Sequence, residues 1–154
     1  MPIIRGCNIP DELLYDVDNN IWYRDNGDGT VTVGMTAVAA AMAGQLVAFT
    51  PKKAGRAVQA GKSCATIESG KWVGPAKLAF DADVVEVNGV LSGNPKLANS
   101  DPYGAGWMVK VRPADWGAAK ATLIGGPAVA APYEAKMTAD NFKGCGQDQG
   151  SSTA

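Results

Sequence analysis

Short apolar runs, interrupted every few positions by turn residues, predict a chain made mainly of β-strands. Asn-Gly and Asp-Gly pairs at residues 26–29 separate the first two clear runs, which we therefore expect to form a hairpin. Short strands with frequent turn residues are typical of a sandwich or a barrel. The strand patterns lie at residues 21–24, 30–35, 45–49, 63–68, 76–80, 84–90 and 106–111.

One internal segment, residues 36–44, departs from the strand pattern. Thr36 can accept a hydrogen bond as a helix N-cap, and the alanines that follow it favour helix. Gly44 can end the helix, because glycine readily adopts the backbone conformation of a helix C-terminus. We therefore expect a helix of about two turns between two strands.

The end of the chain changes from strand patterns to helix patterns. Residues 114–124 are rich in alanine and suit a helix, and residues 128–142 suit a second helix whose start Pro132 limits. Residues 144–154 are rich in Gly, Ser and Gln, which predicts a flexible tail. We expect a single domain at residues 1–143 followed by this tail.

The composition narrows the class of protein. A chain of 154 residues suits one domain with its own core, and 46% hydrophobic residues argue against disorder. A net charge of -1 argues against a nucleic-acid binder, which would carry a basic patch. No apolar run approaches the roughly 18 residues that span a bilayer, and the first residues lack a signal-peptide pattern. We expect a cytoplasmic protein that binds neither nucleic acid nor membrane.

The reactive side chains narrow the chemistry further. The chain has no histidine, which removes the commonest general base and the commonest metal ligand. Cys7, Cys64 and Cys145 lie far apart without a C-x-x-C pair, which argues against a zinc site. Since no catalytic constellation is visible, we expect a protein without a metal that is not an enzyme.

Five short motifs follow one another in the middle of the chain. They are VTVGMT at 31–36, ESGK at 68–71, VVEVN at 84–88, NPKLAN at 94–99 and DPYGAGW at 101–107. In this order they resemble the glycine cleavage H proteins, which are lipoyl carriers, and the resemblance spans about residues 21–113. ESGK alone would be a weak match because four residues recur easily, so the ordered motifs on either side carry the resemblance.

The resemblance implies a fold and an attachment site. The fold is a barrel-sandwich hybrid of two small antiparallel sheets, as in lipoyl and biotinyl carriers, with a short internal helix and C-terminal helices. Lipoic acid would be amide-linked to Lys71, which follows Glu68, Ser69 and Gly70 in a tight hairpin turn. We expect Gly70 to adopt a positive φ and to keep bulk away from a modifying enzyme.

Elementary physical chemistry agrees with this assignment. A hairpin turn fixes the backbone of Lys71 and leaves its long side chain exposed, as a swinging arm requires. On spacing alone, an ordinary solvated turn lysine would be the better interpretation of Lys71, and the framing motifs reverse that judgement. Lys77 is the nearest rival, but it lies on the outgoing strand rather than at the turn.

The sequence departs from the H-protein pattern around the attachment site. Trp72, Val73 and Gly74 follow Lys71 where most H proteins have small residues such as Ala-Ala-Ser. Trp72 has two interpretations. It is either a packing residue of the hairpin or an aromatic platform that touches the dithiolane ring or a partner.

These departures resemble the H-like lipoate-binding proteins of sulfur-oxidising prokaryotes. That resemblance implies a lipoyl arm that cycles between disulfide and dithiol and carries sulfur intermediates. The implied partners are a heterodisulfide-reductase-like complex, lipoate-attaching enzymes and a dihydrolipoamide dehydrogenase. Two alternatives stay open: a glycine cleavage H protein that carries the aminomethyl group, and an unmodified carrier-fold module that binds or regulates.

Two cysteines lie beside glycines in the terminal segments. A reducing cytoplasm favours free thiols at Cys7 and Cys145. In the alternative interpretation they meet in space, form a redox-sensitive disulfide and act near a sulfur cargo. We expect Cys64, which lies in the strand before the turn, in the core or on the sheet surface.

Overall fold

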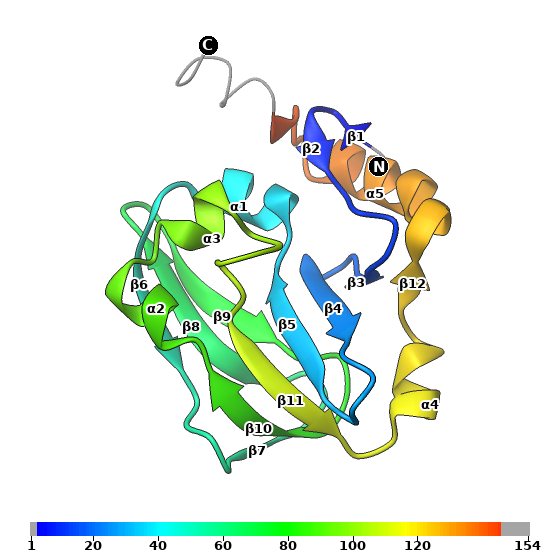
Figure 1. Cartoon of the computed structure of the whole chain (residues 1–154). Helices are drawn as coiled ribbons and strands as arrows, with labels where there is room; N and C mark the ends of the chain where they lie inside the picture. Colours follow the sequence, from blue (N-terminus) through cyan, green and yellow to red (C-terminus); the bar gives the residue numbers. More distant parts are fainter. Residues whose placement is uncertain (1–2, 146–154) are drawn as a thin grey trace.

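The computed structural model describes residues 3–145 and contains two large antiparallel sheets and a short ribbon (Figure 1). The ribbon pairs β1 (Ile3–Ile4) with β2 (Cys7–Asn8). The three-stranded sheet has β6 (Leu46–Pro51) and β9 (Val73–Lys77) on either side of β8 (Ser63–Ser69). The seven-stranded sheet contains, from edge to edge, β12 (Ile124–Gly125), β3 (Leu14–Asp16), β4 (Ile21–Asp25), β5 (Val31–Met35), β11 (Val109–Pro113), β10 (Ala82–Val87) and β7 (Ala57–Val58).

The helices are short and lie around the sheets. Their bounds are α1 (Ala37–Ala43), α2 (Gly89–Gly93), α3 (Leu97–Ser100), α4 (Trp116–Lys120), the 3-10 helix η1 (Gly126–Val129) and α5 (Ala130–Ala139). The helices α1 and α3 lie side by side at the upper end of the sandwich in Figure 1. The expectation of a mainly β chain with two antiparallel sheets and terminal helices is confirmed.

The two sheets enclose a common apolar core. In β8 buried and exposed residues alternate, because successive side chains of a strand point to opposite faces. Ile67 of β8 therefore joins Val33, Leu78 and Val111 in one buried cluster. Each fully buried aliphatic side chain contributes about 1.5–3 kcal/mol, so this cluster is the main source of the sandwich's stability.

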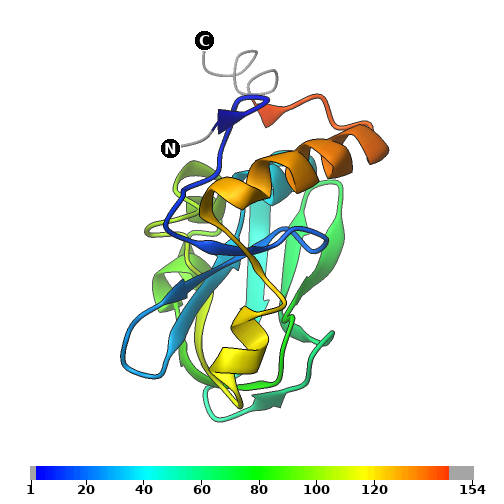
Figure 2. The ribbon, with the colours of Figure 1, turned by 90° about the vertical axis from the view of Figure 1, so that its right-hand side faces the viewer.

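A second apolar cluster lies on the outside of the larger sheet, under α5. Tyr15, Trp22, Tyr133 and Met137 are fully buried there. Figure 2 shows α5 crossing the upper end of the sheet that contains β3 and β4. The C-terminal helix therefore covers one face of the sheet, while the smaller sheet covers the other.

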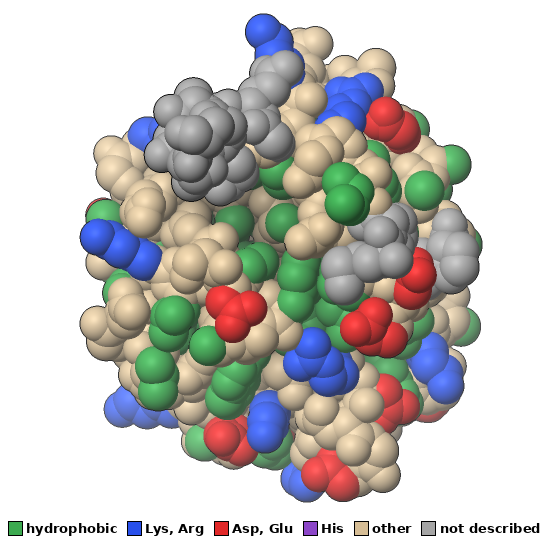
Figure 3. Space-filling model, turned by 45° about the horizontal axis from the view of Figure 1, so that its top comes forward, with side chains coloured by type: hydrophobic (Ala, Val, Ile, Leu, Met, Phe, Trp, Pro, Cys, Tyr) green, Lys and Arg blue, Asp and Glu red, His purple; other side chains and the backbone are tan. Residues whose placement is uncertain are grey.

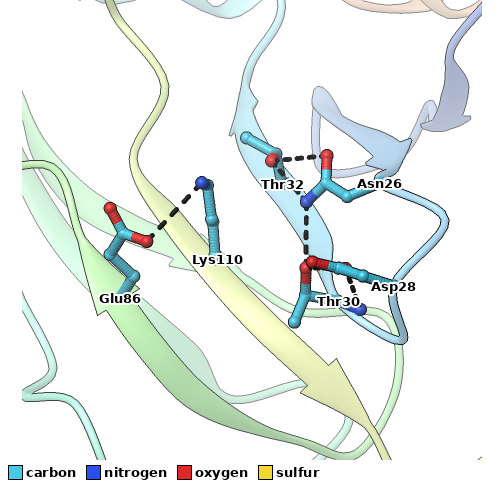
Figure 4. Close-up of polar contacts among 6 residues, drawn as sticks. All are labelled: Asn26, Asp28, Thr30, Thr32, Glu86 and Lys110. Atoms are coloured by element: carbon cyan, nitrogen blue, oxygen red, sulfur yellow. Dashed lines mark hydrogen bonds and ion pairs between the residues drawn. The ribbon is translucent and has the colours of Figure 1, made fainter.

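The hairpin predicted around residues 26–29 joins β4 to β5. Gly27 and Gly29 both have positive φ, which explains the glycines of the turn. The carboxylate of Asp28 accepts hydrogen bonds from the backbone N–H and the hydroxyl of Thr30, at 3.0 and 2.6 Å (Figure 4). On the neighbouring strands, Glu86 and Lys110 form an exposed ion pair at 3.5 Å, which contributes little to stability.

The predicted internal helix is confirmed as α1. Its N-cap residue Thr36 accepts a hydrogen bond from the Ala39 N–H at 3.3 Å. At the other end, Gly44 has a φ of 82° and donates its N–H to the carbonyl of Ala40. The cap and the glycine therefore set the two ends of the helix as the sequence indicates.

Three predicted strands have the wrong ends, and the one expected at 106–111 is β11, which spans Val109–Pro113. The strand expected at 76–80 is β9, which starts at Val73 because Val73 already pairs with Glu68 in the hairpin. The strand expected at 84–90 is β10, which ends at Val87 because Asn88 caps α2. The side-chain oxygen of Asn88 accepts the N–H of Val90 at 3.2 Å, and this turns the chain out of the sheet.

The C-terminal helices are also shorter than expected. The helix expected at 114–124 is α4, which ends at Lys120, and Ile124 instead pairs with Tyr15 in the large sheet. The helix expected at 128–142 is α5, and it ends at Ala139. Sheet pairing with a distant strand overrides the local helix preference in the first case. None of the helices within residues 3–145 is long and apolar enough to cross a membrane.

Figure 3 shows the molecule with the upper end of Figure 1 turned forward, and it bears on how charge is distributed over this surface. Among the described residues on this face, acidic and basic side chains are intermixed with apolar ones, and neither sign gathers into a patch. This distribution agrees with the nearly balanced count of 14 basic and 15 acidic residues.

The two ends of the described chain are covalently joined. Cys7 and Cys145 form a disulfide with a Cα–Cα distance of 4.9 Å, and both are buried. The Cys145 N–H donates to the carbonyl of Arg5 at 2.9 Å, and the Arg5 guanidinium reaches Glu134 of α5 at 2.8 Å. Gly144 and Cys145, which we assigned to the tail, therefore belong to the folded unit, and the rest of the predicted tail, residues 146–154, lies outside the described residues.

We expected free thiols at Cys7 and Cys145 in a reducing cytoplasm, and the structure instead pairs them in a disulfide. Whether this disulfide responds to reductant can be tested. In denaturant without reductant, an alkylating reagent should modify only Cys64; after reduction it should modify all three cysteines. The bond joins residues separated by 138 positions, so the double variant Cys7→Ser, Cys145→Ser should lose about 2–5 kcal/mol of unfolding free energy in urea titrations. Equal alkylated masses with and without reductant would contradict the pairing.

Candidate functional site

The hairpin between β8 and β9 presents Lys71 at its tip. The Ser69 N–H donates to the carbonyl of Trp72 at 2.7 Å, which closes a loop of two residues, Gly70 and Lys71. The buried side chain of Ser69 also accepts the N–H of Lys71 at 3.2 Å. The backbone of Lys71 is thus fixed from two sides while its side chain stays exposed.

Gly70 does not have the positive φ that we expected. Its φ lies outside the left-handed region, and a Cβ built on it would meet nothing within 4 Å. The expected conformational reason for this glycine is therefore wrong. What the residue does provide is open space directly beside Lys71.

Glu68 lies on the outer surface of the small sheet. It pairs between Ala48 of β6 and Val73 of β9, and its side chain is exposed. Its neighbours Val47 and Val73 are 57% and 60% exposed. Glu68 and its apolar flanks are therefore accessible from outside, on the face opposite to the buried Ile67.

The stem of Lys71 lies against the end of α1. A Cβ added to Gly44 would lie 3.1 Å from Cε of Lys71 and 3.8 Å from its Nζ. Because Gly44 also has a φ of 82°, any other residue there would be strained as well as crowded against the lysine. The sequence predicts Gly44 only as a helix end, and its contact with Lys71 was missed.

Asn99 holds this corner of the chain. Its side-chain oxygen accepts the N–H of Leu46 at 2.9 Å, and its amide nitrogen donates to the carbonyls of Gly44 and Ala40 at 2.8 and 3.3 Å. The bonds to Leu46 and Gly44 satisfy backbone groups beyond the end of the helix, and the carbonyl of Ala40 also accepts the N–H of Gly44. Asn99 ends the motif at 94–99, but its role was missed because its partners lie more than fifty positions away.

A cavity of about 530 Å³ opens beside Lys71. Its size falls within the range of small-molecule sites, about 300–1,000 Å³. The lining comes from the turn between β3 and β4, from α1 and β5, and from the hairpin of β8 and β9, with more apolar than polar side chains. Members of the lining include Asn20, Met35, Met42, Ile67, Lys71 and Trp72.

Trp72 and Lys77 both line this cavity. The indole of Trp72 lies over Gly74, because a Cβ on Gly74 would come within 2.1 Å of its ring. Trp72 is nevertheless 41% exposed, so it packs on the hairpin and also offers a free surface. Lys77 lies at the end of β9, opposite Ser63, and not at the turn.

The cysteines are not part of this cavity's described lining. Cys64 is buried, and burial raises the pKa of its thiol to about 12, so it stays protonated at neutral pH and unreactive. The Cys7–Cys145 disulfide lies at the other end of α1, where the sulfur of Cys145 is 3.5 Å from the carbonyl oxygen of Ala37. Within residues 3–145, no group of three or more Cys, Asp or Glu side chains is placed to hold a metal ion.

A rigid hairpin that presents an exposed lysine beside a largely apolar cavity is the arrangement of a carrier domain for a covalently attached group. Residues 13–135 match the family described as Glycine cleavage H-protein. This chain belongs to the glycine cleavage H-protein family. It is therefore a lipoyl carrier, whose cofactor is lipoic acid bound to a lysine, and it is not an enzyme.

Individual relatives agree with the family match. Glycine cleavage system H protein 5 of Aquifex aeolicus is 55% identical over 128 residues, which are 80% of this chain and 86% of that protein. Probable glycine cleavage system H protein 2 of Sulfurisphaera tokodaii is 40% identical over 114 residues, 73% of this chain and 77% of that protein. A crystal structure of the H protein from Mycobacterium marinum superposes with a TM-score of 0.71 at 31% identity, covering 84% of this chain and 99% of that one. The expected barrel-sandwich fold is confirmed.

Asn99→Ala tests the corner under Lys71. The change removes three hydrogen bonds and leaves the N–H of Leu46 and the carbonyl of Gly44 without their partner. We expect the free energy of unfolding to fall by about 2–3 kcal/mol, measured by urea denaturation. Ser100→Ala is the matched control, because its hydroxyl bonds only within α3 and the change should cost well under about 1 kcal/mol. Similar losses in both variants would contradict the role of Asn99.

Proposed function

We propose that lipoic acid is attached as an amide to Lys71 and that this arm moves between the neighbouring cavity and partner enzymes. The observation that carries the proposal is the position of Lys71 at the tip of a hydrogen-bonded two-residue loop, at the edge of a cavity of about 530 Å³. Lys77 lines the same cavity but lies on a strand, where it lacks the projecting position that an arm requires. When attached, the lipoyl group supplies reversible thiol–disulfide exchange.

The residues before Lys71 have distinct parts in this proposal. Glu68 is exposed on the outer face, where a lipoate-attaching enzyme can contact it. Ser69 fixes the loop through its two hydrogen bonds, and Gly70 leaves room for that enzyme to approach the lysine. Amide formation removes the charge of Lys71, so the cavity then keeps Asp18 and Lys77 as its charged residues among those described.

For the cargo, we propose first the aminomethyl group of glycine cleavage. The matched family and the printed names of the relatives support this assignment. The partners would then be the other glycine cleavage enzymes, together with lipoate-attaching enzymes and a dihydrolipoamide dehydrogenase. We place the protein in the cytoplasm with these partners.

A second candidate cargo is a sulfur intermediate, exchanged with a heterodisulfide-reductase-like complex. Two observations favour it. Trp72 and Val73 replace the small residues that commonly follow the lysine. In addition, Aquifex aeolicus has relatives numbered 5, 2 and 3, at 55%, 47% and 46% identity, and several carriers in one organism allow some of them to specialise.

Lys71→Arg tests the attachment site. The wild-type protein, produced together with lipoate-attaching enzymes, should gain the mass of one lipoyl amide in intact-mass spectrometry, and the variant should not gain it. Lys77→Arg is the matched control and should be modified like the wild type, because Lys77 is not at the turn. A wild-type protein that stays unmodified would instead support the unmodified binding or regulatory module.

The cargo is tested in cells and with purified partners. If the aminomethyl group is the cargo, the gene should restore growth on glycine to a strain that lacks its own H protein, and the Lys71→Arg variant should not. If sulfur is the cargo, growth should not be restored, and the lipoylated protein should be reduced or loaded only by the heterodisulfide-reductase-like complex. Restored growth together with no response to that complex would reject the second candidate.

A further inference from the structure

The position of the Trp72 indole depends on Gly74, which has no side chain. Trp72 comes directly before β9, and residues two positions apart in an extended chain lie on the same face, because side chains alternate. A Cβ on Gly74 would be 2.1, 2.6 and 2.8 Å from the Cζ2, Cη2 and Cε2 atoms of the indole. The benzene half of the indole therefore occupies the space that any other residue at position 74 would fill. Trp72 therefore lies back over the start of β9, although its side chain is still 41% exposed.

Trp72 also lines the cavity beside Lys71. Trp72 and Met42 both line it and are 41% and 39% exposed, which is unusual for side chains of their size and polarity. Met42 comes from α1 and Trp72 from the hairpin, so an aromatic ring and a thioether sulfur both border the space beside Lys71. Aromatic rings and thioether sulfur are polarizable, and they make favourable contacts with other sulfur atoms and with apolar rings.

We infer that Trp72 is a positioning residue for the lipoyl group and that Gly74 is the residue that keeps the indole in its working orientation. The inference rests on the attachment to Lys71 proposed above and goes beyond it, because it assigns the cavity wall that the ring of the attached group contacts. An indole that projected into solvent would not contact the ring of the attached group. An indole seated on Gly74 provides a flat apolar surface directly beside the attachment point.

Nuclear magnetic resonance of protein carrying carbon-13-labelled lipoic acid tests the contact. In the wild type, the protons of the dithiolane ring should be shifted upfield from those of free lipoamide by the ring current of the indole. Trp72→Leu should abolish the shift and Trp72→Phe should restore part of it. Gly74→Ala should also reduce the shift, although the tryptophan is still present, because the new methyl group displaces the indole.

Gly93→Ala is the matched control. It adds the same methyl group at a glycine of α2 that has open space around it and is not among the described cavity lining, and it should leave the shift unchanged. A second readout is the rate at which iodoacetamide alkylates the reduced dithiol. Loss of one sulfur–aromatic contact should raise this rate about twofold to tenfold in Trp72→Leu and Gly74→Ala, and not in Gly93→Ala.

The possible failures are distinguishable. Intact mass is measured first, and a protein without lipoyl at Lys71 overturns the proposed function and this inference with it. A lipoylated protein whose dithiolane shifts equal those of free lipoamide, or whose Gly74→Ala variant matches the wild type, overturns this inference alone. If Trp72→Leu does not fold, judged by circular dichroism, the comparison of Gly74→Ala with Gly93→Ala and Trp72→Phe still decides the question.

Discussion

Asn99 bonds to the backbone at the point where α1 ends and β6 begins, and the proposed attachment site at Lys71 depends on that corner. Its amide bonds the N–H of Leu46 and the carbonyl of Gly44 as the chain passes from helix to sheet, and it adds a second donor to the carbonyl of Ala40. Gly44 makes the turn possible through its left-handed backbone, and its missing side chain leaves room for the stem of Lys71. A flexible arm thus starts between two rigid supports, the closed hairpin on one side and this corner on the other.

Helix α1 is fixed at both ends. Asn99 bonds to the backbone at its C-terminal end, and Tyr133 and the disulfide contact its start. At its start, the hydroxyl of Tyr133 lies 3.0 Å from that of Thr36 and donates to the side chain of Asn20 at 2.9 Å, which connects α5 to the rim of the cavity. Burial raises the pKa of Tyr133, so it remains a neutral partner across the physiological range. The terminal disulfide adds a covalent connection near Ala37. The fold therefore places rigid structure around the exposed side chain of Lys71. This suits a carrier whose partners perform the chemistry.

Local patterns predicted the parts of the fold that local forces determine. The strand at β8, the cap at Thr36 and the turn before Lys71 follow from periodicity, capping and turn chemistry, and the structure has each of them. The ends of β9 and β10 and the length of α4 were wrong because pairing with distant strands and the Asn88 cap override local preference. The cavity, the contact of Gly44 with the lysine and the roles of Asn99 and Gly74 depend on residues brought together by folding. No pattern along the chain shows that Cys7 lies 4.9 Å from Cys145 between Cα atoms.

The seating of Trp72 on Gly74 also restricts how the sequence can change from one generation to the next. A mutation that gives position 74 a side chain displaces the indole as long as position 72 is tryptophan, so the order of the two substitutions matters. Lineages that keep an aromatic residue directly after the lysine should therefore inherit the glycine with it, while lineages with a small residue there are free to vary. The residues at positions 72 and 74 would then distinguish, within one family, the carriers whose cavity has an aromatic wall from those whose cavity lacks it.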